Sequence, residues 1–384
     1  MFTITFGGWY QRTTLHLSEV YDLLDRGHSK LLLSPHKLLE FHQKLNLKSV
    51  SRENGYLEFV HAFTNDGIEI KYYEDGLYIL SIKSDDIESA HGKLESYYND
   101  FFGPAISYIF SLGAPTPKIL ADIKITNPTV VFIQDTKFNQ SKINTKQFGE
   151  IYSQITSEKY SVFKTPHYIF IASPNNFQKT HELVEMQIFF REFKDQLERY
   201  LNIHRTIWEK IQSIKERPLI SGKLIGNLRN DLDAYQKTIN LISSRIDQMS
   251  TYVNTRANIA AQLKIEDELS SIFQYKFETL SNTHVYIQDI WVMTKEYLDT
   301  ALQVISDVQD QNSDKTLESL RLITTMGVFA SVLDYFAKDS FPSFTAIGFW
   351  YFIILVVGTF IINKLITFIY QNIKYRLEFS KNKT

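Results

Sequence analysis

The chain has 384 residues, no cysteine and a formal net charge of −2 at neutral pH. Without cysteine it has neither disulfide bonds nor thiolate metal ligands, and its balanced charge lacks the basic excess that is typical of nucleic-acid-binding proteins. The length allows an α/β domain, a helical region and a C-terminal segment of different character. We therefore expect no nucleic-acid partner.

Residues 1–175 alternate short strand and helix signals, which predicts a mixed α/β domain. Two apolar segments rich in β-branched and aromatic residues, Thr129–Gln134 and Tyr168–Ala172, are typical of buried strands. The sequence Glu74-Asp75-Gly76 separates two further strand-like segments and predicts a β-hairpin turn.

A candidate ligand-binding segment lies near the beginning of the chain and contains Gly7, Gly8, Trp9 and Arg12. Glycines let a backbone approach a ligand closely, tryptophan offers a ring for stacking, and arginine pairs with carboxylate or phosphate groups. The alternative interpretation is a strand-to-helix turn with a tryptophan in the core. The scattered histidines and the lack of paired carboxylates indicate that the protein is not an enzyme.

Residues 176–320 are almost entirely helical in pattern, with one break at Pro218 and Gly222. The last part of this region and the residues after it, from about Ile265 to Phe336, have no proline and no glycine before Gly327. This predicts one helix of ~105 Å at 1.5 Å per residue. We expect a long-helix stalk with coiled-coil character. Apolar residues recur three and four positions apart before this segment, at Leu228, Leu232, Tyr235, Ile239, Ile242, Ile246 and Met249.

One face of the predicted stalk helix carries Asp307, Asp310 and Asp314. In a parallel oligomer these carboxylates would form rings that attract cations, and they could bind Mg²⁺ or another divalent cation through oxygen ligands. The alternative is a solvated helix face. The same face continues into residues that we expect to line a pore, namely Thr324, Val328, Ser331 and Tyr335.

Two apolar segments predict a transmembrane hairpin over residues 321–370. Ser340–Asn363 has 24 residues without a charge, which exceeds the length of about 20 that a spanning helix needs, and Leu322–Leu333 is a shorter uncharged segment. The excess of lysine and arginine in residues 371–384 predicts a cytosolic tail. We therefore expect contact with membrane lipid, a location in the cell (inner) membrane, and both chain ends in the cytosol.

This layout of an α/β domain, a stalk helix that continues into the membrane, a short loop and a second apolar helix resembles the CorA family of magnesium transporters and channels. The local match lies in Asn312–Phe329, which is similar to the family's junction between stalk and membrane. The resemblance implies a funnel of five copies whose first membrane helix lines the pore. The predicted fold class is thus an α/β cytosolic domain with a helical stalk and two C-terminal transmembrane helices.

The outer mouth departs from the family, whose Gly-Met-Asn motif is absent here. Its place is taken by Lys338, Asp339 and Ser340, or in another register by Phe336-Ala337-Lys338. Five lysines around a mouth would repel a divalent cation unless Asp339 pairs with them. The departure therefore counts against magnesium uptake.

Residues Phe6–His16 are similar to a branch of CorA-like proteins that act as accessory effectors of type III CRISPR antiviral systems and open on binding a nucleotide second messenger such as SAM-AMP. We therefore expect a homo-oligomeric channel, a pentamer by the resemblance, that is gated by a nucleotide ligand of the cytosolic domain. One alternative is a divalent-cation (Mg²⁺) transporter with an altered mouth. Another is a membrane-tethered coiled-coil scaffold.

Overall fold

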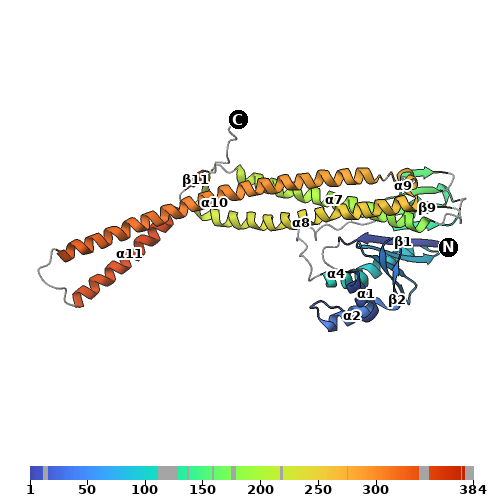
Figure 1. Cartoon of the computed structure of the whole chain (residues 1–384), viewed down its shortest axis with the longest axis horizontal. Coiled ribbons are helices and arrows are strands. Elements are labelled where there is room, and N and C mark those ends of the chain that lie inside the picture. The colour runs from blue at the N-terminus through green and yellow to red at the C-terminus, as the bar shows by residue number, and fades with distance from the viewer. Residues whose placement is uncertain are drawn as a thin grey trace, which may run out of the picture. The chain divides into compact units, whose positions relative to one another are not determined.

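The computed structural model describes residues 1–11, 16–110, 129–135, 138–157, 160–173, 179–216, 219–274, 276–336, 346–372 and 374–376. Figure 1 shows their helices and strands. The chain forms two compact units, of which unit 1 comprises Met1–Ile203 with Leu241–Asp289, and unit 2 comprises His204–Asn240 with Ile290–Thr384. Three long helices belong partly to each unit, and each unit is described by itself.

Among the described residues, unit 1 contains a nine-stranded sheet in the order β2-β3-β4-β5-β1-β6-β9-β8-β7. Strands β6 and β9 pair in parallel, and the other neighbouring strands are antiparallel. The strands are β1 (Phe2–Trp9), β2 (Leu47–Asn54), β3 (Glu58–Thr64), β4 (Glu69–Tyr73), β5 (Leu77–Ser84), β6 (Thr129–Ile133), β7 (Ser153–Thr156), β8 (Ser161–Lys164) and β9 (Tyr168–Ala172).

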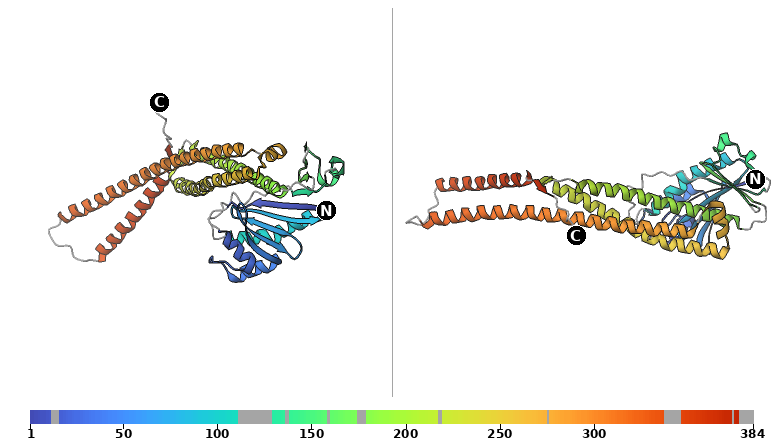
Figure 2. Two further views of the ribbon diagram at one scale, coloured as in Figure 1. Left: turned by 45° about the vertical axis from the view of Figure 1, so that its right-hand side comes forward. Right: turned by 90° about the horizontal axis from the view of Figure 1, so that it is seen from above.

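Short helices cover one face of this sheet (Figure 2). They are α1 (Leu17–Arg26), α2 (Pro35–Leu45), α3 (Ile87–Tyr97) and α4 (Gly103–Phe110), with a π-helical turn at Tyr98–Phe102. Side chains such as Ile4, Leu24, Leu80 and Ile106 are fully buried between helices and sheet, and each contributes about 1.5–3 kcal/mol relative to exposure. A second apolar cluster surrounds β6, β8 and β9 together with α6 (Thr145–Phe148).

The predicted hairpin is confirmed, because β4 and β5 are adjacent antiparallel strands joined by Glu74-Asp75-Gly76. Gly76 has a φ of 89°, in the left-handed region, and a Cβ at this position would overlap the main-chain oxygen of Tyr10. Only glycine therefore fits this turn without strain.

The long helices are α7 (Thr180–Lys215), α8 (Gly222–Leu263) and α10 (Phe277–Phe336), with the short α9 (Glu266–Phe273) before α10. The predicted break near Pro218 and Gly222 is confirmed. The single helix expected from Ile265 to Phe336 is not, because α9 ends where Gln274 adopts a φ of 57° and its N–H bonds back to the main-chain oxygens of Leu269 and Ser270. Six of the seven apolar residues predicted on α8 are buried, namely Leu228, Leu232, Ile239, Ile242, Ile246 and Met249.

In unit 1, the first part of α7, the last part of α8 and the start of α10 pack together above the sheet (Figure 2). His284 lies 2.6 Å from the main-chain oxygen of Ile246, and Gln288 donates to Asp247 at 2.8 Å. In unit 2, α7 and α10 are joined by a stack of Trp208 on Tyr297 with ring centroids 4.3 Å apart, and Arg229 of α8 donates to Gln309 of α10 at 2.8 Å. A two-stranded sheet of β10 (Leu219–Ser221) and β11 (Lys374–Arg376) also lies in unit 2.

The C-terminal helices contradict the predicted transmembrane hairpin. Within the described part of the chain, no helix has the length and apolarity that a membrane crossing requires. Helix α11 (Ala346–Asn372) contains an uncharged segment of 18 residues, Ala346–Asn363, and residues 340–345 lie outside the described residues. The uncharged segment of α10, Leu322–Leu333, is shorter still. The predicted CorA-like funnel, the assignment as a membrane channel and the inner-membrane location are therefore wrong, whereas the mixed α/β sheet and the long helices are present.

Candidate functional site

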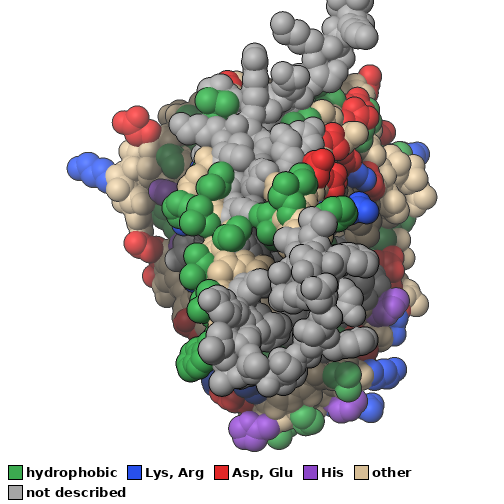
Figure 3. Space-filling view, turned by 90° about the vertical axis from the view of Figure 1, so that its left-hand side faces the viewer, with side chains coloured by type: hydrophobic (Ala, Val, Ile, Leu, Met, Phe, Trp, Pro, Cys, Tyr) green, Lys and Arg blue, Asp and Glu red, His purple; other side chains and the backbone are tan. Residues whose placement is uncertain are grey.

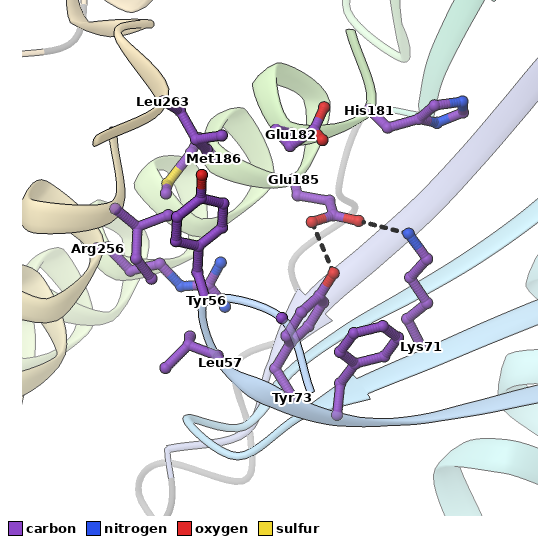
Figure 4. Close-up of a pocket in the computed structure, with 13 residues that line it drawn as sticks. Tyr56, Leu57, Lys71, Tyr73, His181, Glu182, Glu185, Met186, Arg256 and Leu263 are labelled. Carbon is purple, nitrogen blue, oxygen red and sulfur yellow. Dashed lines mark hydrogen bonds and ion pairs between the residues drawn. The ribbon is translucent and has the colours of Figure 1, made fainter. Parts of the chain in front are cut away.

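A pocket of about 290 Å³ in unit 1 lies between the β-hairpins of the sheet and helices α7 and α8 (Figure 4). This volume is close to the lower end of the range for small-molecule sites. The pocket is lined by the β2–β3 turn with Tyr56 and Leu57, by Phe59 of β3, by strand β4, by the start of α7 and by the end of α8.

Local sequence periodicity explains why these side chains face one another. Lys71 and Tyr73 are two residues apart on β4 and so point to the same face of the sheet. Glu182 and Glu185 are three residues apart in the first turns of α7, where the helix dipole favours negative charge. The Nζ of Lys179 donates to the main-chain oxygen of Leu263, which ties the start of α7 to the end of α8.

One polar network of the pocket joins β4 to α7. Lys71 Nζ lies 3.0 Å from Glu185 Oε1, and the Tyr73 hydroxyl donates to Glu185 Oε2 at 2.7 Å (Figure 4). Burial alone would lower the pKa of Lys71, but the Glu185 carboxylate outweighs this effect and raises it. Burial, with the Glu185 charge, raises the pKa of Tyr73. At neutral pH, Lys71 is therefore a cation and Tyr73 a neutral hydrogen-bond donor.

A second network fixes the floor of the pocket. Arg256 of α8 makes two bonds to Asp75, with Nε 2.6 Å from Oδ2 and Nη2 3.0 Å from Oδ1, and both side chains are buried. The guanidinium also lies 5.0 Å from the ring centre of Tyr73, within range of a cation–π interaction. Burial would lower the pKa of Arg256, and the Asp75 carboxylate more than offsets this and raises it. Arg256 is thus committed to Asp75 and positions Tyr73 beside Glu185.

Glu182 differs from the other charged residues of the pocket. Its Oε2 atom is buried and has no hydrogen-bond partner among the described residues. Figure 4 shows Glu182 one turn before Glu185 on α7. A buried acceptor without a donor is costly, and more so when it carries charge. Glu182 is only partly buried and lines the pocket, so its carboxylate can turn towards a donor supplied from outside the chain.

The sequence-predicted ligand residues lie elsewhere in unit 1. Gly7 and Gly8 are in β1 at the middle of the sheet, where a Cβ on Gly7 would lie 2.7 Å from the main-chain oxygen of Tyr78. Trp9 donates from Nε1 to the main-chain oxygen of Asp75 at 2.7 Å and packs among aromatic rings of α7 and α8. Arg12 lies outside the described residues. None of the three described residues lines the pocket, and their role in ligand binding stays a prediction.

The residues predicted to bind metal or to line a pore lie on α10 in unit 2. Asp307, Asp310 and Asp314 are exposed, and in the described part of the chain no group of three or more potential ligands is placed to hold a metal ion. Metal binding stays a prediction.

The residues predicted to line a pore were assigned to a membrane-spanning helix, and no described helix is long and apolar enough to be one. Thr324 donates to the main-chain oxygen of Leu320 at 2.8 Å, and Val328 is exposed. Ser331 and Tyr335 belong to α10, but their side chains are not described. The expected outer mouth, Lys338, Asp339 and Ser340, lies outside the described residues.

Sequence reasoning missed the residues that form the pocket. Lys71 and Glu185 are 114 positions apart, and Asp75 and Arg256 are 181 apart. The spacing of Glu182 and Glu185 on one helix face was the available signal, but nothing in the sequence identified the strand that it meets. Comparisons with protein-family models, curated proteins and solved structures found no match to this chain.

Proposed function

We propose that the chain is a ligand-responsive protein that binds a small molecule in the pocket of unit 1. The observation that carries this proposal is the pocket itself. It combines a prearranged Lys71–Glu185–Tyr73 network with a buried oxygen of Glu182 that no described residue pairs with. Apolar and aromatic walls with a few fixed polar groups are typical of small-molecule sites.

The protonation states of the pocket favour binding over catalysis. The raised pKa of Lys71 keeps its amine protonated, and a protonated amine is neither a base nor a nucleophile. The raised pKa of Tyr73 keeps its hydroxyl neutral. Both groups are therefore suited to fix Glu185 at the pocket by hydrogen bonds and charge rather than to transfer protons at neutral pH.

The two helices that line the pocket, α7 and α8, connect it to unit 2 and can transmit a change that ligand binding causes. α7 contributes Glu182 and Glu185 and continues without interruption to Lys215 in unit 2, and α8 enters unit 1 from residues that belong to unit 2. A ligand that binds one arrangement of these helices more tightly than another shifts the population towards that arrangement. The expected output is a change in the helices of unit 2.

A thermal-shift screen of a metabolite library tests this proposal, with a variant that blocks the pocket. Gly55 lines the pocket, has no positive φ and has ordinary space around a Cβ, so Gly55→Trp narrows the pocket without backbone strain. Gly92→Trp is the matched control, because Gly92 is an exposed residue of α3 with open space around a Cβ. At 100 times its Kd, a ligand stabilises the fold by about 2.7 kcal/mol.

We expect compounds that raise the melting temperature of the wild type and of Gly92→Trp but not of Gly55→Trp. The proposal fails if no compound distinguishes the two variants.

A second candidate function, self-assembly into a helical scaffold, is favoured by exposed apolar side chains on α10 and α11. Figure 3 shows hydrophobic side chains, in green, among those exposed at the surface. On α11, Ile354, Ile361 and Phe368 recur at intervals of seven, and Trp350 and Val357 form a second such row, all exposed. Two rows at this spacing are typical of a coiled-coil seam that a second copy of the chain would cover.

Sedimentation analysis tests this candidate. Ile361→Glu places a charge in the seam and should lower the oligomer mass, whereas Ile362→Glu, an exposed position outside the seam, should leave it unchanged. A monomeric wild type, or equal effects of both variants, would rule out this seam. The pentamer number stays a prediction.

A further inference from the structure

We infer that the ligand of this pocket carries a cationic nitrogen with N–H donors, held by Glu182, joined to a flat apolar part. This inference rests on the proposed ligand-binding function and specifies the class of ligand.

The charged side chains of the pocket form ion pairs with one another, except for one carboxylate. Glu185 accepts bonds from both Lys71 and Tyr73, and Asp75 is bonded twice to Arg256. Glu182 has one buried oxygen with no hydrogen-bond partner in the part of the chain that the structure describes. Lys71 is near enough for Glu182 to contribute to its raised pKa, but its hydrogen bond goes to Glu185. The pocket therefore has an unfilled position for a positive charge.

Neighbouring groups among the described residues do not fill this position. The exposed ring of His181 extends away from Glu182 in Figure 4. The Arg256 guanidinium is fixed on Asp75, with the Tyr73 ring at 5.0 Å and the Phe189 ring at 5.4 Å. A donor that satisfies Glu182 would therefore come from the ligand, where a charged hydrogen bond is about twice as strong as a neutral one.

The aromatic and apolar residues that line the pocket indicate the uncharged part of the ligand. The rings of Tyr56, Phe59 and Tyr73 and the buried apolar side chains of Leu57 and Met186 line the same pocket. Aromatic rings favour both flat groups and cations, through stacking and cation–π attraction. An anionic ligand would instead meet Glu182, with Lys71 and Arg256 already neutralised by their partners. Small arylalkylammonium compounds fit this combination.

Three probes that share one ring and differ in charge test the inference on the full chain by isothermal titration calorimetry. They are phenethylammonium, 2-phenylethanol and 3-phenylpropionate, which are cationic, neutral and anionic. We expect the wild type to bind phenethylammonium about tenfold or more tightly than 2-phenylethanol, as one charged hydrogen bond provides.

Glu182→Gln should remove this preference and leave the affinity for 2-phenylethanol unchanged. Glu198→Gln, an exposed glutamate on the same helix, should leave both affinities as in the wild type. A loss of both affinities in Glu182→Gln would indicate a structural role and would overturn the inference.

Tighter binding of 3-phenylpropionate, equal binding of all three probes, or no binding of any of them would also overturn the inferred ligand class. The wider proposal remains separable from it. If the probes bind equally and Gly55→Trp abolishes their binding, the pocket is a ligand site and only the inferred charge is wrong. If Gly55→Trp binds every probe as the wild type does, the pocket proposal fails as well.

Discussion

Replacing Asp75 by asparagine removes the charge that balances Arg256 beneath the pocket. The two side chains are 3% and 4% exposed, so water cannot replace the lost partner, and their two bonds of 2.6 and 3.0 Å form a bidentate pair. Removing one partner of a buried pair leaves an uncompensated charge and costs about 3–5 kcal/mol. Asparagine preserves the size of the side chain, so the loss reports charge rather than a cavity.

An exposed ion pair of similar geometry serves as the control. Arg52 Nε lies 2.6 Å from Glu58 Oε1, the same length as the buried pair, but these side chains are 42% and 29% exposed. Glu58→Gln should therefore cost only about 0–1 kcal/mol. The comparison isolates burial as the cause of the difference.

Urea unfolding followed by tryptophan fluorescence measures both variants. The indole of Trp9 donates to the main-chain oxygen of Asp75, so its emission reports on this region. We expect a large decrease in the urea midpoint for Asp75→Asn and a small one for Glu58→Gln, with unchanged slopes. Equal losses in the two variants would refute the assignment of Asp75 and Arg256 as the buried pair that fixes the pocket floor.

Two further predictions concern the turn and the pH dependence of stability. Gly76→Ala should lower the free energy of unfolding in urea more than Gly67→Ala does. Both glycines have a positive φ, but only at Gly76 would the new methyl group overlap a main-chain oxygen. Equal losses in the two variants would contradict this close approach. Lys71 and Tyr73 have raised pKa values in the folded protein. Their contribution to the free energy of unfolding is therefore complete below their unfolded pKa values of 10.5 and 10.0, and it is lost as the pH rises through their folded pKa values. The wild type should therefore lose stability above about pH 10 more steeply than a Lys71→Met, Tyr73→Phe double variant, and parallel curves would exclude this linkage.

The local parts of the fold could be predicted from the sequence because their causes are local. The turn at Asp75-Gly76 follows from glycine's access to positive φ, and the buried face of α8 follows from the spacing of residues such as Ile239 and Ile246. The break after α9 could not be predicted, because the left-handed residue is Gln274 rather than glycine or asparagine.

The candidate site was not predicted and the C-terminal helices were predicted wrongly, for different reasons. The site depends on contacts between strand and helix residues more than one hundred positions apart, such as Lys71 with Glu185, which no periodicity encodes. The transmembrane prediction counted uncharged residues from Ser340, whereas the described helix begins at Ala346. The apolar character of that segment was recognised, but no described helix has the length and apolarity of a membrane span.

Hydrogen–deuterium exchange on the full chain tests the central proposal most directly. The measurement compares the free protein with the protein saturated by the compound that stabilises it most in the thermal-shift screen. We expect slower exchange in residues 55–59, 179–186 and 256–263, which line the pocket, together with altered exchange in residues 204–215 of α7. Protection confined to other parts of unit 1, or pocket protection with no change in residues 204–215, would contradict a ligand-responsive protein that signals through α7.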